Sequence, residues 1–484
     1  MKEVHIRKFD SNKMYVELEP DLLRTIDDYY HYYNIEGIRT ILYDFSVVGT
    51  ERVITLGTGF YDQFIKLLIM NDYKITVEDS VKLKSTPIEI NEKWKKVLDS
   101  DFRVIKEKNQ YDYLQELLQF NRATGQLYTG YGKTELLLAI VESYMELHPE
   151  KNVVVLVPDN TIKKEFMERA EKWDLPVTPE YHKFKNRFQL VNPVGLGRNK
   201  KYKAKDPEIV DYFNNVGLLL VDEVHHLTAN SYLYLMDTFL TNYDYIYGVS
   251  GTIDSGEGYI PKLKDTPQDV SGRLNRIISY LGFPRVDVKN PVPINIAYLR
   301  VDSTRIPQKL KFNYQKSVQI FFNSPKLIDA VVKFLNENPD RRMFLPIIQK
   351  TQGKTIVDRV EKILGKGSCV FKSSGGTYPD VETLGYSGLK DYLSNCDKFR
   401  LIIGTTSIYE GFDSDRINTI LLGVGNSQRM TVQPTGRGTR SDDVPLVLLP
   451  WDMNQSNTIV NKQTRSRYAK LKKEFENYKF ITLE

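Results

Sequence analysis

Long apolar runs and cysteines are both scarce in this chain of 484 residues. Its longest apolar stretches, such as residues 218–221 and 446–450, are strand-sized and far shorter than the ~20 residues that span a bilayer. The two cysteines, Cys369 and Cys396, lack the spacing of a metal site and are too few for a disulfide framework. Residues 1–13 are charged from the second position and carry no apolar core, so no secretory signal is expected. We therefore expect a soluble protein of a reducing compartment, the cytoplasm.

A strong excess of one charge is also missing. Lysine and arginine total 67, and aspartate and glutamate total 62, so the formal net charge is +5. This small excess permits a nucleic-acid partner without demonstrating one, because the clustering of cations matters more than their total. The length exceeds what one hydrophobic core supports, which predicts roughly two to four domains.

Hydrophobic periodicity divides the chain into four segments. Residues 1–95 alternate short strands with amphipathic helices, which predicts a small N-terminal α+β domain, and we expect it to be an accessory domain that contacts DNA. Residues 96–290 and 291–452 each alternate helices with short, wholly apolar strands, as parallel sheets covered on both faces do. Residues 453–484 predict a basic helical tail. The expected fold class is therefore α/β, with two tandem parallel-sheet domains.

Four local expectations accompany this division. Residues 21–33 and 381–395 have helical spacing. The basic residues 192–205 predict a flexible loop, and the prolines between residues 284 and 293 predict a linker.

A glycine-rich turn follows a short strand and precedes a helix near residue 130. Glycines let backbone amides curl around phosphate oxygens, and the N-terminus of the next helix adds a favourable dipole. Lys133 is expected to reach the β- and γ-phosphates of a nucleotide, and Thr134 to ligate Mg²⁺. Leu127 replaces the first glycine of the G-x-x-x-x-G-K-T pattern, and a plain turn that caps a helix is the alternative. The predicted nucleotide-binding residues are Thr129, Gly130, Tyr131, Gly132, Lys133 and Thr134.

Two adjacent acids, Asp222 and Glu223, follow the apolar run 218–221. The carboxyl ends of buried parallel strands are where such sheets bind ligands. Asp222 suits a contact to Mg²⁺, and Glu223 suits orienting and deprotonating an attacking water. An Asp-Glu pair at a strand end can also be only a helix cap. Its place downstream of a phosphate loop favours catalysis.

A family resemblance begins at this acidic pair. Residues 222–225, which end in His225, resemble the D-E-x-H box of superfamily 2 helicases. The residues after the next apolar strand, Ser250, Gly251 and Thr252, resemble the S-A-T coupling segment of that family. The resemblance implies two RecA-like domains, in which these residues link nucleotide state to the grip on nucleic acid.

Two segments of the second half complete the family pattern. Residues 410–413 resemble the E-G-x-D segment, and residues 433–440 match Q-x-x-G-R-x-x-R. A planar guanidinium can stabilise the charge that gathers on a transferring γ-phosphate, although an isolated arginine would more often form a surface salt bridge. Arginines three residues apart share a helical face. The residues that these segments imply are Gly411 and Asp413 at the nucleotide, Gln433 in coupling, and Arg437 and Arg440 as catalytic arginines reaching ATP across the domain interface.

Gln110 lies upstream of the phosphate loop, where helicases of this superfamily often carry a glutamine that reads the adenine edge. The flanking residues depart from the usual R-x-Y-Q order. A glutamine at a helix start without a role in binding is the alternative.

Nucleic-acid contacts are expected from loops of both α/β domains. The segment at Pro158 and Asn160 resembles the family segment that holds backbone phosphates, and the basic residues 192–205 suit phosphate contacts or a merely solvated loop. The basic tail could bind DNA or pack as a stabilising helix. The predicted DNA-binding residues are Pro158, Asn160, Gly195, Arg198, Lys200, Lys201, Gln349, Thr405 and Thr406.

Within the superfamily, the chain resembles phage branch-migration helicases of the UvsW type, which pair a small N-terminal α+β domain with two RecA-like domains and a short helical tail. Trp451-Asp452, which follows the apolar run 446–450, carries this finer likeness. The resemblance implies ATP hydrolysis with Mg²⁺ and the remodelling of forked or junction DNA in replication, recombination or repair. An RNA helicase on the same core and a duplex translocase without strand separation stay open. Lys133, Glu223 and Arg440 disfavour a non-catalytic scaffold.

Overall fold

The computed structural model describes residues 3–17, 20–34, 36–48, 51–78, 87–99, 108–175, 177, 186–253, 261–303, 320–322, 324–347, 350–373, 375–405, 414–423, 427–439, 443–453 and 458–483. The chain divides into two units. The first comprises Met1–Leu127, Tyr131–Asp254 and Tyr259–Val288, and the second comprises Tyr128–Gly130, Ser255–Gly258 and Lys289–Glu484.

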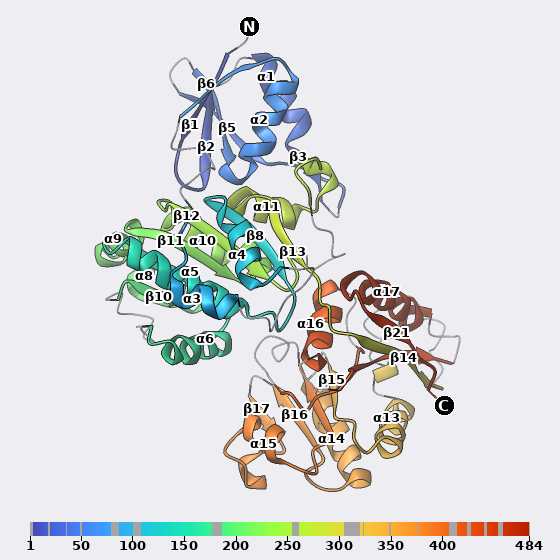
Figure 1. The fold of residues 1–484 in the computed structure, drawn as a ribbon. Coiled ribbons are helices and arrows are strands. Elements are labelled where there is room, and N and C mark those ends of the chain that lie inside the picture. Colours follow the sequence, from blue (N-terminus) through green and yellow to red (C-terminus); the bar gives the residue numbers. More distant parts are fainter. Residues whose placement is uncertain are drawn as a thin grey trace. The chain divides into compact units, whose positions relative to one another are not determined.

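The first unit begins with a five-stranded sheet in the order β5-β6-β2-β1-β7. Apolar residues alternate along β1 and β2, so Val4, Ile6, Met14 and Val16 share one buried face of this sheet. Helices α1 and α2 lie beside it, and their apolar residues join the same core (Figure 1). The elements are β1 (Glu3–Lys8), β2 (Lys13–Glu17), α1 (Pro20–Tyr29), β3 (His31–Tyr33), β4 (Arg39–Ile41), β5 (Tyr43–Val48), β6 (Glu51–Gly57), η1 (Thr58–Phe60), α2 (Tyr61–Met70) and β7 (Lys74–Val77).

A six-stranded parallel sheet follows, in the order β10-β9-β11-β12-β8-β13. Its strands β9 and β11 are buried throughout, as their apolar runs predict. β8 is also buried throughout, although Arg122, Thr124 and Gln126 are polar. The strands are β8 (Arg122–Leu127), β9 (Asn152–Leu156), β10 (Phe188–Val191), β11 (Val216–Asp222), β12 (Tyr245–Ser250) and β13 (Pro284–Val288). The helices are α3 (Glu92–Leu98), α4 (Gln110–Leu118), α5 (Lys133–Leu147), α6 (Asn160–Lys172), α7 (Pro193–Leu196), α8 (Lys200–Lys203), α9 (Pro207–Asn214), η4 (Val224–Thr228), α10 (Asn230–Thr238), η5 (Pro267–Asp269) and α11 (Gly272–Leu281).

The N-terminal sheet and the parallel sheet share one hydrophobic core. Asn12, in the turn between β1 and β2, donates two hydrogen bonds of 2.9 Å to the carbonyls of Met236 and Leu240. Arg122, at the start of β8, donates to the Ser11 carbonyl at 2.7 Å. The N-terminal segment is therefore continuous in packing with the first parallel sheet, and the boundary expected near residue 95 falls inside α3.

The second unit contains an eight-stranded sheet in the order β17-β16-β18-β15-β19-β20-β14-β21. All its pairs are parallel except β16 with β17 at one edge. The elements are β14 (Ile294–Val301), α13 (Pro325–Glu337), β15 (Met343–Pro346), α14 (Lys350–Leu364), β16 (Cys369–Ser373), β17 (Gly376–Tyr378), η7 (Glu382–Leu384), α15 (Leu389–Asn395), β18 (Leu401–Gly404), β19 (Thr419–Leu421), α16 (Gln428–Gly438), β20 (Leu446–Asp452), α17 (Thr458–Glu474) and β21 (Tyr478–Phe480). The end of the chain thus adds an edge strand to this sheet as well as a helix.

The predicted α/β fold class, with two parallel-sheet domains and a small N-terminal α+β part, is confirmed. In the part of the chain that the structure describes, no helix is long and apolar enough to cross a membrane.

Two of the local helix and loop expectations are wrong near the first sheets. The helix expected over residues 21–33 ends at Tyr29, and His31–Tyr33 instead forms β3, since its aromatic residues favour strand pairing with β4. Residues 192–205 are not a flexible loop, because Asn192 caps the helical turn α7 through the amides of Val194 and Gly195, and α8 follows.

Two more expectations are wrong around the second sheet and its approach. Residues 381–395 do not form one helix, because Gly385 adopts φ +92° and separates η7 from α15. Pro284 does not belong to a linker but opens the edge strand β13, where a proline is tolerated as the first residue.

Candidate nucleotide and nucleic-acid sites

The predicted catalytic residues of the first unit follow neighbouring strands at one edge of the parallel sheet. In the ladder order β11-β12-β8, Asp222 pairs with Val249, and Ser250 pairs with Gln126. The register therefore brings the carboxyl ends of these three strands to the same level. The phosphate loop follows β8, the acidic pair closes β11, and the Ser-Gly-Thr segment closes β12.

The phosphate loop depends on two glycines with left-handed backbone. Gly130 has φ +92° and Gly132 has φ +90°, a conformation that residues with a Cβ rarely adopt. Gly132 is also the N-cap of α5, so Lys133 and Thr134 are the first two residues of that helix. The side-chain amide of the buried Gln110 donates to the Tyr131 carbonyl and thereby holds the loop from behind.

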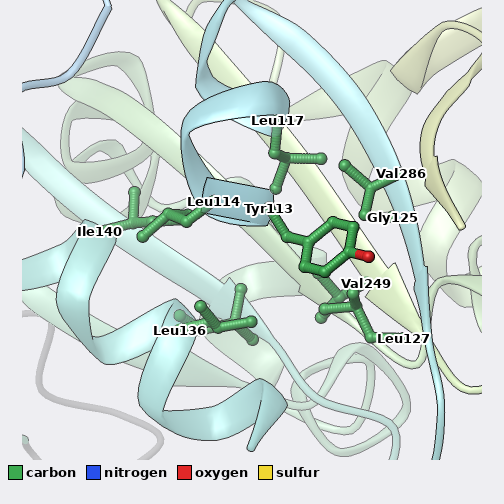
Figure 2. Close-up of a pocket in the computed structure, with 10 residues that line it drawn as sticks. Tyr113, Leu114, Leu117, Gly125, Leu127, Leu136, Ile140, Val249 and Val286 are labelled. Atoms are coloured by element: carbon green, nitrogen blue, oxygen red, sulfur yellow. The ribbon is translucent and has the colours of Figure 1, made fainter. Parts of the chain in front are cut away.

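Leu127 replaces the usual first glycine without disturbing this loop because it is the last residue of β8 rather than part of the turn. Its side chain is buried in a small apolar cavity together with Tyr113, Leu117 and Val286 (Figure 2). The cavity measures about 10 Å³, roughly the space of one water, and is therefore too small for a nucleotide. Leu127 thus anchors the strand under the loop.

Four side chains meet beyond the strand ends. Lys133 Nζ lies 3.6 Å from Oε1 of Glu223. The Ser250 hydroxyl donates to Oε2 of Glu223 at 2.7 Å and also accepts from the Thr252 amide at 3.2 Å. Nδ1 of His225 lies 3.0 Å from the Ser250 hydroxyl and 3.4 Å from Oε2 of Glu223. The structure therefore joins the predicted nucleotide, catalytic and coupling residues through one carboxylate.

The pKa values of the two adjacent carboxyl groups, Asp222 and Glu223, differ in the direction of their shift. Burial raises the pKa of Asp222 well above its ordinary value, and the Glu223 carboxylate adds to the rise, while Lys133 opposes it. Burial acts in the same direction on Glu223. Lys133, His225 and the Ser250 hydroxyl together outweigh burial there, so the pKa of Glu223 lies below its ordinary value. The pKa values of the two neighbouring carboxyl groups are therefore shifted in opposite directions.

The backbone at Glu223 is unusual. Its φ of +50° and ψ of 60° place a residue with a long side chain in the left-handed region. Such a conformation costs on the order of 1 kcal/mol or more and persists only where the surroundings hold it. The amide of Glu223 also donates to Oδ1 of Asp222 at 2.9 Å. This turn directs the carboxylate away from the strand axis and toward Lys133 and Ser250.

Three residues near this constellation were not predicted to contribute to it. The side-chain carbonyl of Gln126 accepts from the Ile253 amide at 3.3 Å and so steadies the segment that follows Ser250. Asn109 and Asp112 cap the helix that begins with Gln110 by exchanging hydrogen bonds of 2.9 Å. The signal in the sequence for the helix cap was the N-x-x-D pattern, whereas Gln126 stands in the mixed polar and apolar strand RATGQL and gave no such signal.

In the second unit, Gln433 and Arg437 both lie on α16, four residues apart, and are mostly buried. Thr405 follows β18 and is also buried. Gln349, Thr406, Gly411, Asp413 and Arg440 lie outside the residues that the structure describes.

The predicted nucleic-acid contacts of the first unit lie on two short stretches. Asn160 is the exposed first residue of α6, whose start is capped by Asp159 through the Ile162 amide at 2.9 Å. Arg198 is exposed between α7 and α8, Gly195 belongs to α7, and Lys200 and Lys201 belong to α8. Pro158, half-buried, follows β9. These residues remain predictions for nucleic-acid binding.

Residues 81–255 match the family described as "Type III restriction enzyme, res subunit", a stretch that includes Lys133, Glu223 and Ser250. "Putative helicase 22" of Sulfolobus islandicus filamentous virus (isolate Iceland/Hveragerdi) is 25% identical over 343 residues, which cover 64% of this chain and 56% of the relative. The chain thus spans a little over half the length of this curated relative. The helicase-type resemblance that the motifs predict is confirmed by these matches, and they support an ATP-dependent helicase.

Solved structures add a likeness in fold. The structure of "DUF1998 helicase MrfA bound to DNA and AMPPNP" has a TM-score of 0.51 at 15% identity and covers 83% of this chain and 55% of that one. The structure of T4 UvsW has a TM-score of 0.43 at 16% identity and covers 100% of this chain and 99% of that one. The finer UvsW-type resemblance therefore rests on sequence motifs.

Proposed function

We propose that this chain is a DNA motor that hydrolyses ATP to unwind or branch-migrate forked and junction DNA. The observation that carries the proposal is the buried constellation in which Glu223 contacts both Lys133 and Ser250 directly behind a glycine-rich phosphate loop. A lysine for phosphate charge and a carboxylate that can orient a water are two of the parts that phosphoryl transfer to water uses, and the Ser250 hydroxyl fixes that carboxylate.

The residues of the loop fit ATP as substrate. The left-handed Gly130 and Gly132 allow the loop amides to turn toward phosphate oxygens, and α5 adds its N-terminal dipole. The Lys133 ammonium lies near the negatively charged carboxylate of Glu223 in this structure. The β- and γ-phosphates of ATP are also negatively charged, so the same ammonium can pair with them.

The same edge offers oxygen donors for Mg²⁺ in the Thr134 hydroxyl and the Asp222 carboxyl group. Among the described residues, no group of three or more His, Cys, Asp or Glu could hold a metal ion. The Thr134 hydroxyl and the Asp222 carboxyl group are oxygen donors of the kind that Mg²⁺ takes together with substrate phosphates. When bound, Mg²⁺ would neutralise phosphate charge.

Glu223 is the proposed base that orients and deprotonates the attacking water. Its Oε2 accepts a hydrogen bond from Ser250 and lies near His225. Its Oε1 lies near Lys133 and is the oxygen that we expect to contact the water. Among the groups that lower its pKa, Lys133 contributes most, so Glu223 would become a stronger base when that ammonium pairs with the phosphates instead. Ser250 and His225 then act as positioning residues, and they connect the end of β12 to the catalytic carboxylate.

The second unit is proposed to supply arginines and further contacts. Arg437 and Arg440 would stabilise the charge that develops on the γ-phosphate. Gln433, Gly411 and Asp413 would complete the nucleotide contacts and their coupling. The DNA contacts are proposed for the residues predicted from the sequence, which are Pro158, Asn160, Gly195, Arg198, Lys200, Lys201, Gln349, Thr405 and Thr406.

The proposal names DNA as the substrate because MrfA, whose fold is similar, is described as bound to DNA and AMPPNP. Forked and junction DNA follow from the UvsW-type motifs. An RNA helicase on the same core would bind through 2′-hydroxyl groups. Comparing strand displacement on a DNA fork with that on an RNA fork of the same sequence distinguishes a DNA helicase from an RNA helicase.

The deciding experiment compares ATP hydrolysis by the purified chain without nucleic acid and with single-stranded, duplex, forked and four-way DNA. We expect stimulation by DNA and ATP-dependent strand displacement on the branched substrates. Glu223→Gln should abolish both, whereas Glu168→Gln, an exposed acid on α6, serves as the matched control. A chain that hydrolyses ATP equally with and without DNA, and displaces no strand, would contradict the proposal.

A duplex translocase that separates no strands is the second candidate. The description of the matching family as a restriction-enzyme subunit favours it. Such a motor would displace a triplex-forming third strand from linear duplex while leaving forks paired. A triplex-displacement assay beside the fork assay therefore distinguishes the two candidates.

A further inference from the structure

Five aromatic side chains form a continuous row on the second unit, where α17 meets the edge of its sheet. They are contributed by β14, β20, α17 and β21. The ring centroids lie 5.0 Å apart for Trp451 and Tyr298, 5.0 Å for Tyr298 and Phe480, 5.7 Å for Phe480 and Tyr468, and 6.5 Å for Tyr468 and Tyr478. We call these five residues the aromatic row.

The row reaches solvent at its outer end. β21 is the edge strand of the eight-stranded sheet, and Figure 1 shows it beside α17 and β14 close to the C-terminus. Tyr478 is 37% exposed and Phe480 is 40% exposed. Large exposed aromatic groups gathered at one place often mark an interaction surface.

Cations lie directly over these rings. The guanidinium of Arg465 is 5.5 Å from the centroid of the Trp451 ring. The ammonium of Lys472 is 5.7 Å from the ring of Tyr468 and 5.5 Å from that of Tyr478. Both cations come from the exposed side of α17. Positive charge and aromatic rings are therefore interleaved on one surface.

The sequence left two interpretations of the basic tail, DNA binding and structural packing. Each applies to one face of α17. Arg467 is only 1% exposed and donates to the Gly423 carbonyl at 3.3 Å and to the Gln463 side chain at 3.0 Å. Thr464 donates to the Pro450 carbonyl at 2.5 Å. This face packs the helix onto the sheet. The exposed cations of residues 458–483 are Lys462, Arg465, Lys472, Lys473 and Lys479, against one exposed acid, Glu476.

This end of the chain concentrates the positive charge of the protein. Residues 458–483 contain seven lysines and arginines and two glutamates, a net charge of +5, which equals the formal charge of all 484 residues. Phosphate binding depends on such local clustering rather than on the total charge. The remainder of the chain has almost no excess charge to contribute.

We propose that the aromatic row and the cations beside it bind single-stranded DNA as an accessory site of the second unit. Unpaired bases offer open ring faces that stack on aromatic side chains, and a neighbouring line of cations follows the phosphates. The stacked bases of a duplex cover their faces with each other, so duplex could use only the cations. The inference rests on the proposed function in that its ligand is the DNA on which the motor acts.

The site is distinct from the predicted loop contacts of this unit. Those contacts follow β15 and β18, which lie in the interior of the sheet order, whereas β14 and β21 form its far edge. A strand released by the motor could be held there while the motif loops hold its partner strand.

The test uses the full chain without nucleotide and a bromodeoxyuridine-containing oligothymidine of about 20 nucleotides. Ultraviolet crosslinking followed by peptide mass spectrometry should place crosslinks within residues 458–483. The double variant Tyr478→Leu with Phe480→Leu retains apolar packing but removes the rings. Affinity for this oligonucleotide should fall about tenfold in it, while affinity for duplex of the same length stays unchanged.

A second double variant tests the cations. Arg465→Gln with Lys472→Gln should lower the slope of log affinity against log salt by about 1.4, since each single-strand phosphate contact contributes about 0.7. Lys333→Gln, an exposed lysine on α13 of the same unit, is the matched control and should leave the slope unchanged. These variants leave the nucleotide residues intact, so ATP hydrolysis without DNA should stay at its normal rate.

The proposal is overturned if no crosslink falls within residues 458–483 and the aromatic double variant binds normally. Equal loss of single-stranded and duplex binding in the aromatic variant would also overturn it, because stacking would then not be the cause. Binding that depends on the row in a chain without DNA-stimulated ATP hydrolysis would keep this inference and refute the motor. If DNA binding does not depend on the aromatic row but DNA stimulates ATP hydrolysis, this inference is refuted and the proposed motor function stands.

Discussion

Replacing Asn12 by alanine should test whether the N-terminal sheet and the first parallel sheet fold as one unit. Asn12 is 1% exposed, and its side chain donates to the carbonyls of Met236 and Leu240 at 2.9 Å each. It also accepts from the Tyr243 hydroxyl at 2.5 Å. One short side chain from the N-terminal sheet therefore satisfies three polar groups at the end of α10 and the start of β12.

The magnitude follows from what Asn12→Ala leaves behind. A net hydrogen bond contributes about 1 kcal/mol, and a buried group left without a partner costs about 1–3 kcal/mol. Partial relaxation by water reduces the sum, so we expect a loss of about 2–4 kcal/mol in the free energy of unfolding of the first unit. Domains of this size are stable by only about 5–15 kcal/mol. The change should therefore be large.

Urea denaturation followed by tryptophan fluorescence measures this loss when it is done in a Trp451→Phe background, which removes the tryptophan of the second unit. Trp94 and Trp173 lie 4.8 Å apart in the first unit, far along the chain from Asn12, and report on its parallel-sheet part. If the core is shared, their transition should shift to lower urea in Asn12→Ala. Asn242→Ala, which removes an exposed side chain with one bond of 3.3 Å, should change stability by less than about 0.5 kcal/mol. An unchanged tryptophan transition in Asn12→Ala would refute the reasoning.

Four further predictions address function and solubility. Lys133→Ala should abolish ATP hydrolysis with little change in the melting temperature, and near-normal turnover would remove Lys133 from the site. Glu223→Gln should keep ATP binding but slow single-turnover hydrolysis by ~10²-fold or more, so an equal loss of both would make it structural. Arg440→Ala should reduce turnover much more than nucleotide affinity, and the reverse pattern would contradict its catalytic assignment. Deleting residues 1–95 should yield aggregated protein in a pelleting assay because the deletion opens the shared core, whereas a soluble, DNA-stimulated ATPase would show that the segment is separable.

Short-range features of the sequence determine much of the candidate site. Gly130 and Gly132 indicate a turn with left-handed backbone, and the Lys-Thr pair after them indicates a helix start at a phosphate site. The apolar run before Asp222 indicates a buried parallel strand. Such features depend on the conformational preferences of a few neighbouring residues, so they can be predicted from the sequence alone.

The arrangement around Glu223 could not be predicted in the same way. Its left-handed backbone has no local cause, because a glutamate has no preference for positive φ. The contact between Ser250 and Glu223 depends on the register of β11 against β12 and on the loops after both strands. Only packing of the whole sheet sets these.

The basic and aromatic residues at the end of the chain also show the difference between what the sequence predicts and what only the tertiary structure sets. The sequence by itself predicted a basic helical tail over residues 453–484 and left DNA binding and structural packing as alternatives. The structure divides this segment into the helix α17 and the edge strand β21. The tertiary structure decided that Arg467 packs inward while Arg465 and Lys472 lie over aromatic rings. Tyr298 of β14 meets Trp451 and Phe480, far along the chain, because β14 pairs with β20 and β21. The N-terminal sheet joins the first core through Asn12 in the same long-range way. Local preference sets where a helix or turn forms, but which distant side chains meet depends on the burial of apolar surface over the entire fold.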